Sequence, residues 1–97
     1  MLLKMFTVYD SKAESHIKPF TMLSTGEAIR GFITTLNDNQ SDMSLYPSDF
    51  TLFEIGEYNP RTAEITPNKS LINLGNGLHL KAQGNDKKYL TSGEANV

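Results

Sequence analysis

The segment from Tyr46 to Tyr58 most constrains what this chain can fold into, because it is the longest apolar-rich run in the sequence. Many of its residues are aromatic or β-branched, and such side chains fit a pleated, half-buried surface. Pro47 near its start and Pro60 beyond its end mark turns on both sides. We predict a central strand here, and alternation places one set of side chains on a shared face: Phe50, Leu52, Glu54, Gly56 and Tyr58.

Shorter strands are predicted around this central one. Residues 4–10 have the composition of a first strand, and residues 17–23 form a second whose start is restricted by Pro19. After a turn at residues 59–62, the chain is expected to return as an antiparallel partner that stops at Pro67.

Further along, Gly75-Asn76-Gly77 separates two short apolar segments. Glycine and asparagine accept the positive φ angles of tight turns, so this spacing suits a hairpin. A loose arm is an equally good interpretation of the same residues.

One helix is predicted from a capping signal and a periodic stripe. In Ser24-Thr25-Gly26-Glu27 the Ser24 hydroxyl is expected to accept from the Glu27 amide, while the Glu27 carboxylate accepts from the Ser24 amide. The helix then runs from Thr25 to Leu36. Its apolar residues recur on one face that needs a sheet to cover: Ala28, Ile29, Phe32, Ile33 and Leu36.

These elements predict an α+β fold, a small antiparallel sheet of about four strands covered on one face by a single helix. Residues 1–82 form one domain, and residues 83–97, which bring few groups to bury, are predicted to be a disordered tail. The uncovered sheet face of so short a chain is expected to be an interaction surface. Pairing of edge strands into a homodimer or higher homo-oligomer would protect it.

The composition restricts the chemistry further. There is no cysteine, which excludes disulfides and suits a reducing cytoplasm. The N-terminal apolar residues are too few for a signal peptide or a membrane span. Residues 1–66 carry five cations against nine acids, whereas residues 67–97 carry four against two. This asymmetry indicates a cationic tail on an acidic body, although small chance imbalances explain it as well.

No constellation of residues specifies a reaction. Glu54 and Glu57 fall on opposite faces of the predicted strand and cannot act as an acid/base pair. Gly75-Asn76-Gly77 lacks the lysine and hydroxyl of a phosphate loop. His16 has no second ligand at metal spacing and is interpreted as a plain loop histidine. We therefore expect no enzymatic activity, no metal and no cofactor.

Three blocks carry a resemblance to a known family: residues 5–14 (MFTVYDSKAE), residues 26–32 (GEAIRGF) and residues 45–58 (LYPSDFTLFEIGEY). In this order they resemble the small non-structural DNA-binding protein of gokushovirus-type microviruses, which are phages with single-stranded DNA genomes. The resemblance covers about residues 4–67 and departs from the family at Asn59-Pro60-Arg61-Thr62-Ala63, where acidic residues and a glycine are usual. It implies single-stranded DNA binding in genome replication or packaging, in the host bacterial cytoplasm.

A single-strand binder needs exposed aromatic rings on which bases stack and cations that follow the backbone. Phe53 is instead interpreted as a core residue because of its neighbours Leu52 and Ile55. The predicted nucleic-acid site therefore consists of three tyrosines and seven cations: Lys4, Tyr9, Lys12, Lys18, Arg30, Tyr46, Tyr58, Lys81, Lys87 and Lys88.

Two other functions stay open. One is a protein-interaction module, an assembly or host-factor adaptor without nucleic-acid binding, which the acidic body suits. The other is a purely structural homo-oligomer.

Overall fold

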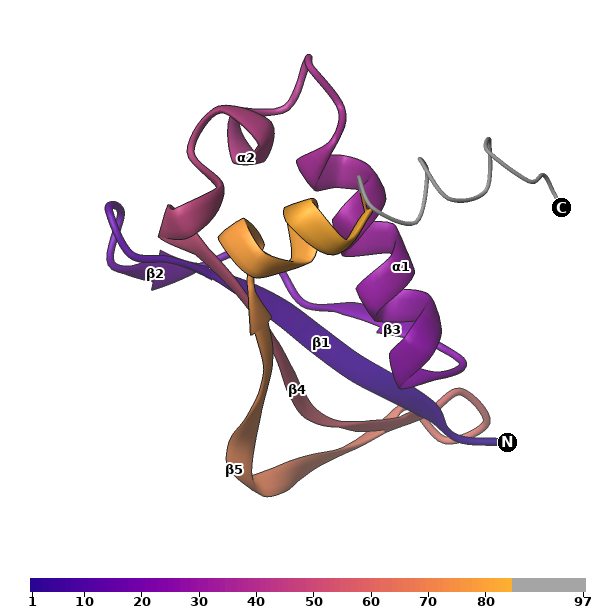
Figure 1. Ribbon diagram of the computed structural model, residues 1–97. Coiled ribbons are helices and arrows are strands. Elements are labelled where there is room, and N and C mark those ends of the chain that lie inside the picture. Colours follow the sequence, from indigo (N-terminus) through magenta and orange to yellow (C-terminus); the bar gives the residue numbers. More distant parts are fainter. Residues whose placement is uncertain (85–97) are drawn as a thin grey trace, which may run out of the picture.

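The computed structural model describes residues 1–84 and has an α+β fold, an antiparallel five-stranded sheet with helices packed on it (Figure 1). The strand order is β2-β1-β4-β5, and β3 pairs with the same edge of β1 as β2. The predicted α+β class is confirmed, but the sheet has five strands instead of about four, and more than the single predicted helix packs on it. The elements, in chain order, are β1 (Leu3–Asp10), β2 (Ser15–His16), β3 (Phe20–Met22), α1 (Thr25–Leu36), α2 (Asp42–Leu45), the 3-10 turn η1 (Pro47–Asp49), β4 (Phe50–Asn59) and β5 (Glu64–Asn76).

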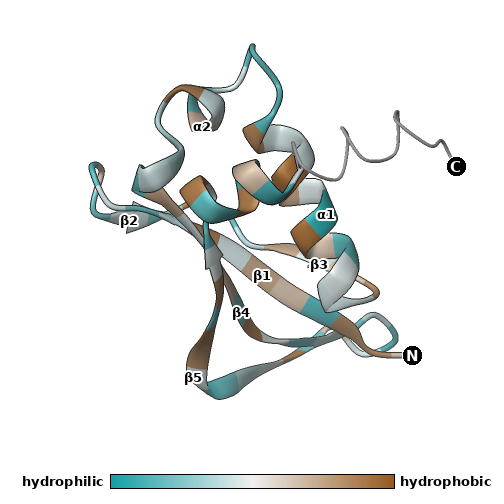
Figure 2. Cartoon of the chain, viewed as in Figure 1, coloured by the Kyte–Doolittle hydropathy of each residue, from teal (hydrophilic) through white to brown (hydrophobic). Residues whose placement is uncertain are grey.

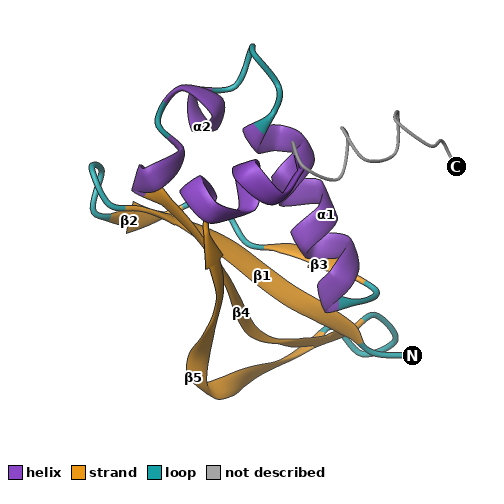
Figure 3. Cartoon of the chain, viewed as in Figure 1, coloured by secondary structure: helices purple, strands orange, loops and turns teal. Residues whose placement is uncertain are grey.

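The centre of the sheet is the antiparallel pair β1 and β4, as the run from Tyr46 to Tyr58 predicted. Phe6 and Val8 of β1 lie opposite Glu54 and Leu52 of β4. Their face of the sheet, which we call the helix face, is covered by the helices (Figure 3). The core lies between the two layers and is made of Phe6, Val8, Ala28, Phe32, Leu36, Phe50, Leu52 and Leu80.

A bulge interrupts the pairing of β1 with β4 and changes which side chains share a face. Phe6 pairs with Glu54 but its neighbour Met5 pairs with Gly56, so Ile55 is an extra residue on β4. The alternation predicted for Phe50, Leu52 and Glu54 is confirmed. For Gly56 and Tyr58 it is wrong, because the extra residue moves them to the opposite face.

The helix α1 has the predicted bounds, and its cap differs in one contact. The Glu27 amide donates to the Ser24 hydroxyl at 3.2 Å, as expected. The Glu27 carboxylate, however, accepts from the Leu23 amide at 3.2 Å, one residue earlier than predicted. The cap still satisfies two amides that would otherwise lack a partner at the start of the helix.

The strand β5 is longer than predicted. Its first residues form the expected hairpin with β4, but the strand continues through Pro67 to Asn76. Proline is tolerated because β5 is an edge strand and needs no ladder bond on its outer side. Between the pairs Gly56–Pro67 and Glu54–Ile72, residues 68–71 leave the ladder. In Figure 1 the strand turns sharply and returns toward the helices.

The hairpin predicted around Gly75-Asn76-Gly77 is wrong, because residues 77–84 are helical. This helix packs on the helix face, with Leu80 in the core. Buried residues recur every three or four positions in amphipathic helices, as Gly77 and Leu80 do here and as Ala28, Phe32 and Leu36 do in α1. Figure 2 shows both hydrophobic and hydrophilic residues on these helices. The predicted disordered tail began at Gln83, yet Gln83 and Gly84 belong to this helix. Residues 85–97 lie outside the described residues.

Candidate functional site

Among residues 1–84, no helix packs on the face of the sheet opposite the helix face, and we call this face the open face (Figure 3). Its membership follows from cross-strand pairing, because directly paired residues on antiparallel strands share a face. Four residues of β1, Leu3, Met5, Thr7 and Tyr9, alternate with the residues of the helix face and therefore belong to the open face. The open face consists of Leu3, Met5, Thr7, Tyr9, His16, Thr51, Phe53, Ile55, Gly56, Tyr58, Ile65, Pro67, Asn73 and Asn76.

Three aromatic rings meet at one end of the open face, and we call them the ring cluster. Tyr9 and His16 are paired residues of β1 and β2, with ring centroids 4.8 Å apart and planes tilted by 51°. His16 also lies 6.2 Å from Phe53 of β4 in an edge-to-face arrangement. Rings at these separations attract one another and hold their orientation. The cluster is thus an ordered aromatic surface beside solvent.

The sequence interpretation missed two members of the ring cluster. Phe53 was assigned to the core, but it points away from Phe50 and Leu52 and is half-buried on the open face. Alternation from Phe50 was a signal that could have found it. His16 was interpreted as a loop histidine. Residues 11–14 form a turn that brings β2 back alongside β1, and His16 owes its position to this pairing. The sequence around His16 does not indicate the pairing.

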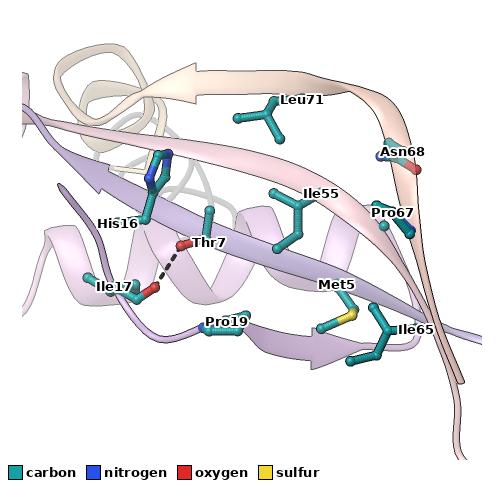
Figure 4. Close-up of a pocket in the computed structure, with 11 residues that line it drawn as sticks. Met5, Thr7, His16, Ile17, Pro19, Ile55, Ile65, Pro67, Asn68 and Leu71 are labelled. Carbon is teal, nitrogen blue, oxygen red and sulfur yellow. Dashed lines mark hydrogen bonds between the residues drawn. The ribbon is translucent and has the colours of Figure 1, made fainter. Parts of the chain in front are cut away.

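An apolar pocket of about 370 Å³ lies on the open face next to the ring cluster (Figure 4). His16 belongs to both, so the two features are continuous. Figure 4 shows side chains from β1, β4, β5 and the segment between β2 and β3 around the same space. The lining residues are Met5, Thr7, His16, Ile17, Pro19, Ile55, Gly56, Ile65, Pro67, Asn68 and Leu71.

Two of the few polar groups in the pocket wall are already hydrogen-bonded within the chain. The Thr7 hydroxyl, which is buried, donates to the Ile17 carbonyl at 2.9 Å. The Asn68 amide nitrogen donates to the Glu54 carbonyl at 3.3 Å. A ligand group in this pocket therefore meets mainly aliphatic side chains.

The acidic residues of the strands all belong to the helix face, by the same pairing rule. Asp10 pairs with the core residue Phe50, and Glu57 pairs with Lys4. Glu64 precedes Ile65, which is on the open face, and so points the other way. Glu54 is buried on the helix face, where it accepts from the Thr25 hydroxyl at 2.9 Å and lies 3.8 Å from the Lys4 ammonium. The carboxylates of the sheet are thus kept away from the ring cluster and the pocket.

Lysines lie beside the pocket on two opposite sides. Lys18 is exposed between the lining residues Ile17 and Pro19. Lys69 is exposed next to Asn68, in the part of β5 that leaves the ladder. Figure 4 shows Ile17 and Pro19 across the pocket from Asn68 and Leu71. The backbone on two sides of the pocket therefore carries an exposed lysine next to a lining residue.

The structure brings some of the predicted site residues together and separates others. Tyr9 and Tyr58 are on the open face at opposite ends of the pocket, since Tyr58 pairs with Leu3 and Ile65. Lys18 borders the pocket, as described above. Tyr58 thus shares the open face with the ring cluster, to which Tyr9 already belongs, and Lys18 borders the same face.

The other predicted cations and Tyr46 lie elsewhere. Lys4 is paired with Glu54 on the helix face, and Arg30 is exposed on α1. Lys12 and Tyr46 line a depression together with Asp10, Asp42 and Asp49, an acidic neighbourhood. Lys87 and Lys88 lie outside the described residues. The assignment of all these residues to a nucleic-acid site stays a prediction.

Lys81 holds two elements of the helix layer together. Its ammonium donates to the Ser44 carbonyl at 2.7 Å and to the Ser44 hydroxyl at 3.2 Å. These bonds tie the helix of residues 77–84 to α2. A lysine committed in this way has a structural role that the sequence did not indicate.

Residues 1–84 contain neither a candidate metal centre nor a helix suited to span a membrane. The described part of the chain contains no cluster of three or more histidine, aspartate or glutamate side chains that would hold a metal ion. None of its helices has the length and apolar character needed to cross a membrane.

Comparison with known proteins identifies a family. A family model described as Phage ORF5 protein matches residues 3–80, which include β1 to β5 and the start of the C-terminal helix. No curated protein and no solved structure matches the chain.

Proposed function

This chain belongs to the Phage ORF5 protein family, and from that premise we propose that it is a non-enzymatic single-stranded DNA-binding protein. It would act in replication or packaging of a phage genome in the cytoplasm of the bacterial host. The resemblance of residues 4–67 to the DNA-binding protein of gokushovirus-type microviruses supports this proposal independently of the fold.

The observation that carries the proposal is the content of the open face. Tyr9, His16 and Phe53 present rings at one end, and Tyr58 presents another at the far end of the pocket. Bases stack on such rings with little regard to sequence, because every base has a flat aromatic face. The carboxylates of the strands point to the helix face. A phosphate backbone that approaches the open face would therefore not meet them. This arrangement reconciles nucleic-acid binding with a net charge of −2.

A protein-interaction module is the second candidate, and the aliphatic wall of the pocket favours it. Ile65 and Leu71 line the pocket and are 59% and 50% exposed, as expected of a surface that receives an apolar side chain. The two candidates differ in their response to salt. Binding to DNA weakens steeply as salt rises, because phosphate contacts release counterions. Binding of an apolar peptide does not.

The test is to replace single tyrosines by alanine and to measure affinity for single-stranded DNA by fluorescence anisotropy. Tyr9→Ala and Tyr58→Ala should each weaken binding by about 1–3 kcal/mol if a base stacks on the ring. The slope of log affinity against log salt should stay nearly unchanged, since stacking releases few counterions. Tyr46→Ala is the comparison variant, since this exposed ring lies among aspartates away from the open face; unchanged affinity would limit the predicted site to the tyrosines of the open face.

Two results would count against the site. If Tyr9→Ala and Tyr58→Ala bind as well as the parent while retaining its melting temperature, the open face is not where DNA binds. If the parent protein binds no single-stranded DNA even at low salt, the protein-interaction module replaces the proposal.

A further inference from the structure

The pocket beside the ring cluster offers an aliphatic surface, which differs from the aromatic surface of the cluster. Its wall is formed by aliphatic side chains, among them Met5, Ile55, Ile65 and Leu71. The Thr7 hydroxyl and one N–H of the Asn68 amide already donate within the chain. Few polar groups of the wall are left to pair with a buried donor or acceptor of a ligand, and an unpaired group would cost affinity. The pocket favours a group that is small, flat and apolar along one edge.

The pocket is placed where a nucleotide next to a stacked base would lie. His16 is shared by the ring cluster and the pocket wall, and Thr7 is two residues from Tyr9 on the same face of β1. Lys18 and Lys69 are exposed and are sequence neighbours of lining residues on two sides of the pocket, so both lysines are candidates to contact the phosphates of a crossing strand. Its volume of about 370 Å³ is ample for one single-ring base. Tyr58, at the far end, offers the next ring.

Among the bases, thymine has the matching edge. Its 5-methyl group is the apolar feature that distinguishes it in direct recognition, and adenine, guanine and cytosine have no such group. We propose that the apolar pocket takes the thymine base of a single strand, with the 5-methyl group against the wall formed by Met5, Ile55 and Leu71. This inference rests on the proposed DNA-binding function. Because RNA carries uracil, which lacks the methyl group, the same contact favours DNA over RNA.

The experiment compares oligodeoxythymidylate with oligodeoxyuridylate of equal length at one salt concentration. The two probes have the same sugar and the same charge and differ only in the methyl group. Burial of one methyl group should make the thymidylate bind roughly fourfold more tightly for each occupied pocket. Fluorescence anisotropy measures both affinities directly.

A pocket variant separates the pocket from the rings, since a methyl group also adds stacking area. Leu71→Asn removes part of the apolar wall at a residue that is 50% exposed and outside the ladder, so the fold should persist. It should abolish most of the preference for thymidylate over deoxyuridylate. Leu78→Asn is the matched control, because Leu78 is 54% exposed on the helix of residues 77–84, away from the open face. It should leave the preference intact.

Each outcome decides a different point. Equal affinity for the two probes overturns the thymine pocket while leaving single-strand binding in place. A preference that survives in Leu71→Asn overturns it as well, because the rings would then be sensing the methyl group. No binding to either probe overturns the proposed function itself, and with it the inference.

Discussion

At the scale of single residues, Ile55 and Gly56 build the open face. The extra residue Ile55 turns the following part of β4 over, so that Tyr58 joins the open face instead of the helix face. Gly56 permits the close approach of β5. A Cβ atom at this position would lie 2.5 Å from the Thr66 carbonyl oxygen and 3.0 Å from the Pro67 Cα. Both are backbone atoms that cannot move aside without shifting the strand.

Gly56→Ala should therefore destabilise the protein by about 1–3 kcal/mol, the usual cost of overpacking a close contact. Urea unfolding followed by circular dichroism measures the change. Gly31→Ala is the matched control, because a Cβ atom there meets only the Met22 Cε, at 3.9 Å. Helix propensity predicts that this control gains up to about 1 kcal/mol. Equal stability of the two variants would show that β5 does not approach β4 as closely as described.

Prediction from the sequence succeeded at the residues where alternation is local and failed where another strand intervenes. Phe50 and Leu52 were assigned to the correct face because only their own strand decides it. The bulge at Ile55 coincides with the segment where residues 68–71 of β5 leave the ladder, and nothing within residues 46–58 shows this. Phe53 was assigned to the core because its neighbours Leu52 and Ile55 are apolar. Leu52, however, points to the helix face, and Ile55 lines the pocket on the open face.

At the scale of elements, one helix was predictable from the sequence and another was not. The helix α1 was predicted with its bounds because its start is encoded by Ser24 and Glu27 and its stripe by the apolar period. The helix of residues 77–84 follows Gly75-Asn76-Gly77, which is typical of a turn. The Asn76 side chain instead donates to the carbonyls of Ser48 and Phe50, and Gly77 packs against Pro47. These contacts join residues that are far apart in the sequence, so the local sequence around residues 75–77 does not predict them.

Leu80 is the residue through which this helix joins the core, where it is 6% exposed and lies over Gly75. Leu80→Ala should destabilise the protein by about 2–5 kcal/mol, since the cavity adds to the lost transfer free energy. Leu78→Ala, on the same helix but 54% exposed, should change stability by no more than about 0.5 kcal/mol. Thermal unfolding of both variants provides the measurement. A Leu80→Ala variant as stable as the parent would mean that the helix does not dock on the sheet.

At the scale of the whole molecule, the two faces of the sheet carry different kinds of side chain. The helix face holds the core and the carboxylates of the strands, and the open face holds the rings and the apolar pocket. The outer edge of β5 carries Pro67 and Lys69 and is broken at residues 68–71, and the opposite edge consists of the short strands β2 and β3. Such features block strand pairing between molecules. The homodimer predicted through edge strands therefore stays a prediction, and these edges count against it.

The separation of charge between the faces leads to a test with salt. Lys18 and Lys69 lie beside the pocket, whereas Lys12 lies among Asp10, Asp42 and Asp49. If a phosphate backbone crosses the pocket, Lys18→Gln and Lys69→Gln should each reduce the slope of log affinity against log salt by about 0.7, the value for one phosphate contact on a single strand. Binding titrations over a range of salt concentrations measure this slope.

Lys12→Gln is the matched control for these two variants. It removes the same unit of charge from the molecule, so any effect of net charge alone would appear in all three variants. Binding across the pocket instead predicts a slope that falls for Lys18→Gln and Lys69→Gln and is unchanged for Lys12→Gln. Identical slopes for the three variants would place the backbone elsewhere. The cations assigned from the sequence to a nucleic-acid site, Lys4, Arg30, Lys81, Lys87 and Lys88, would then be the next to replace, and Lys81 would need a stability control because it holds Ser44 of α2.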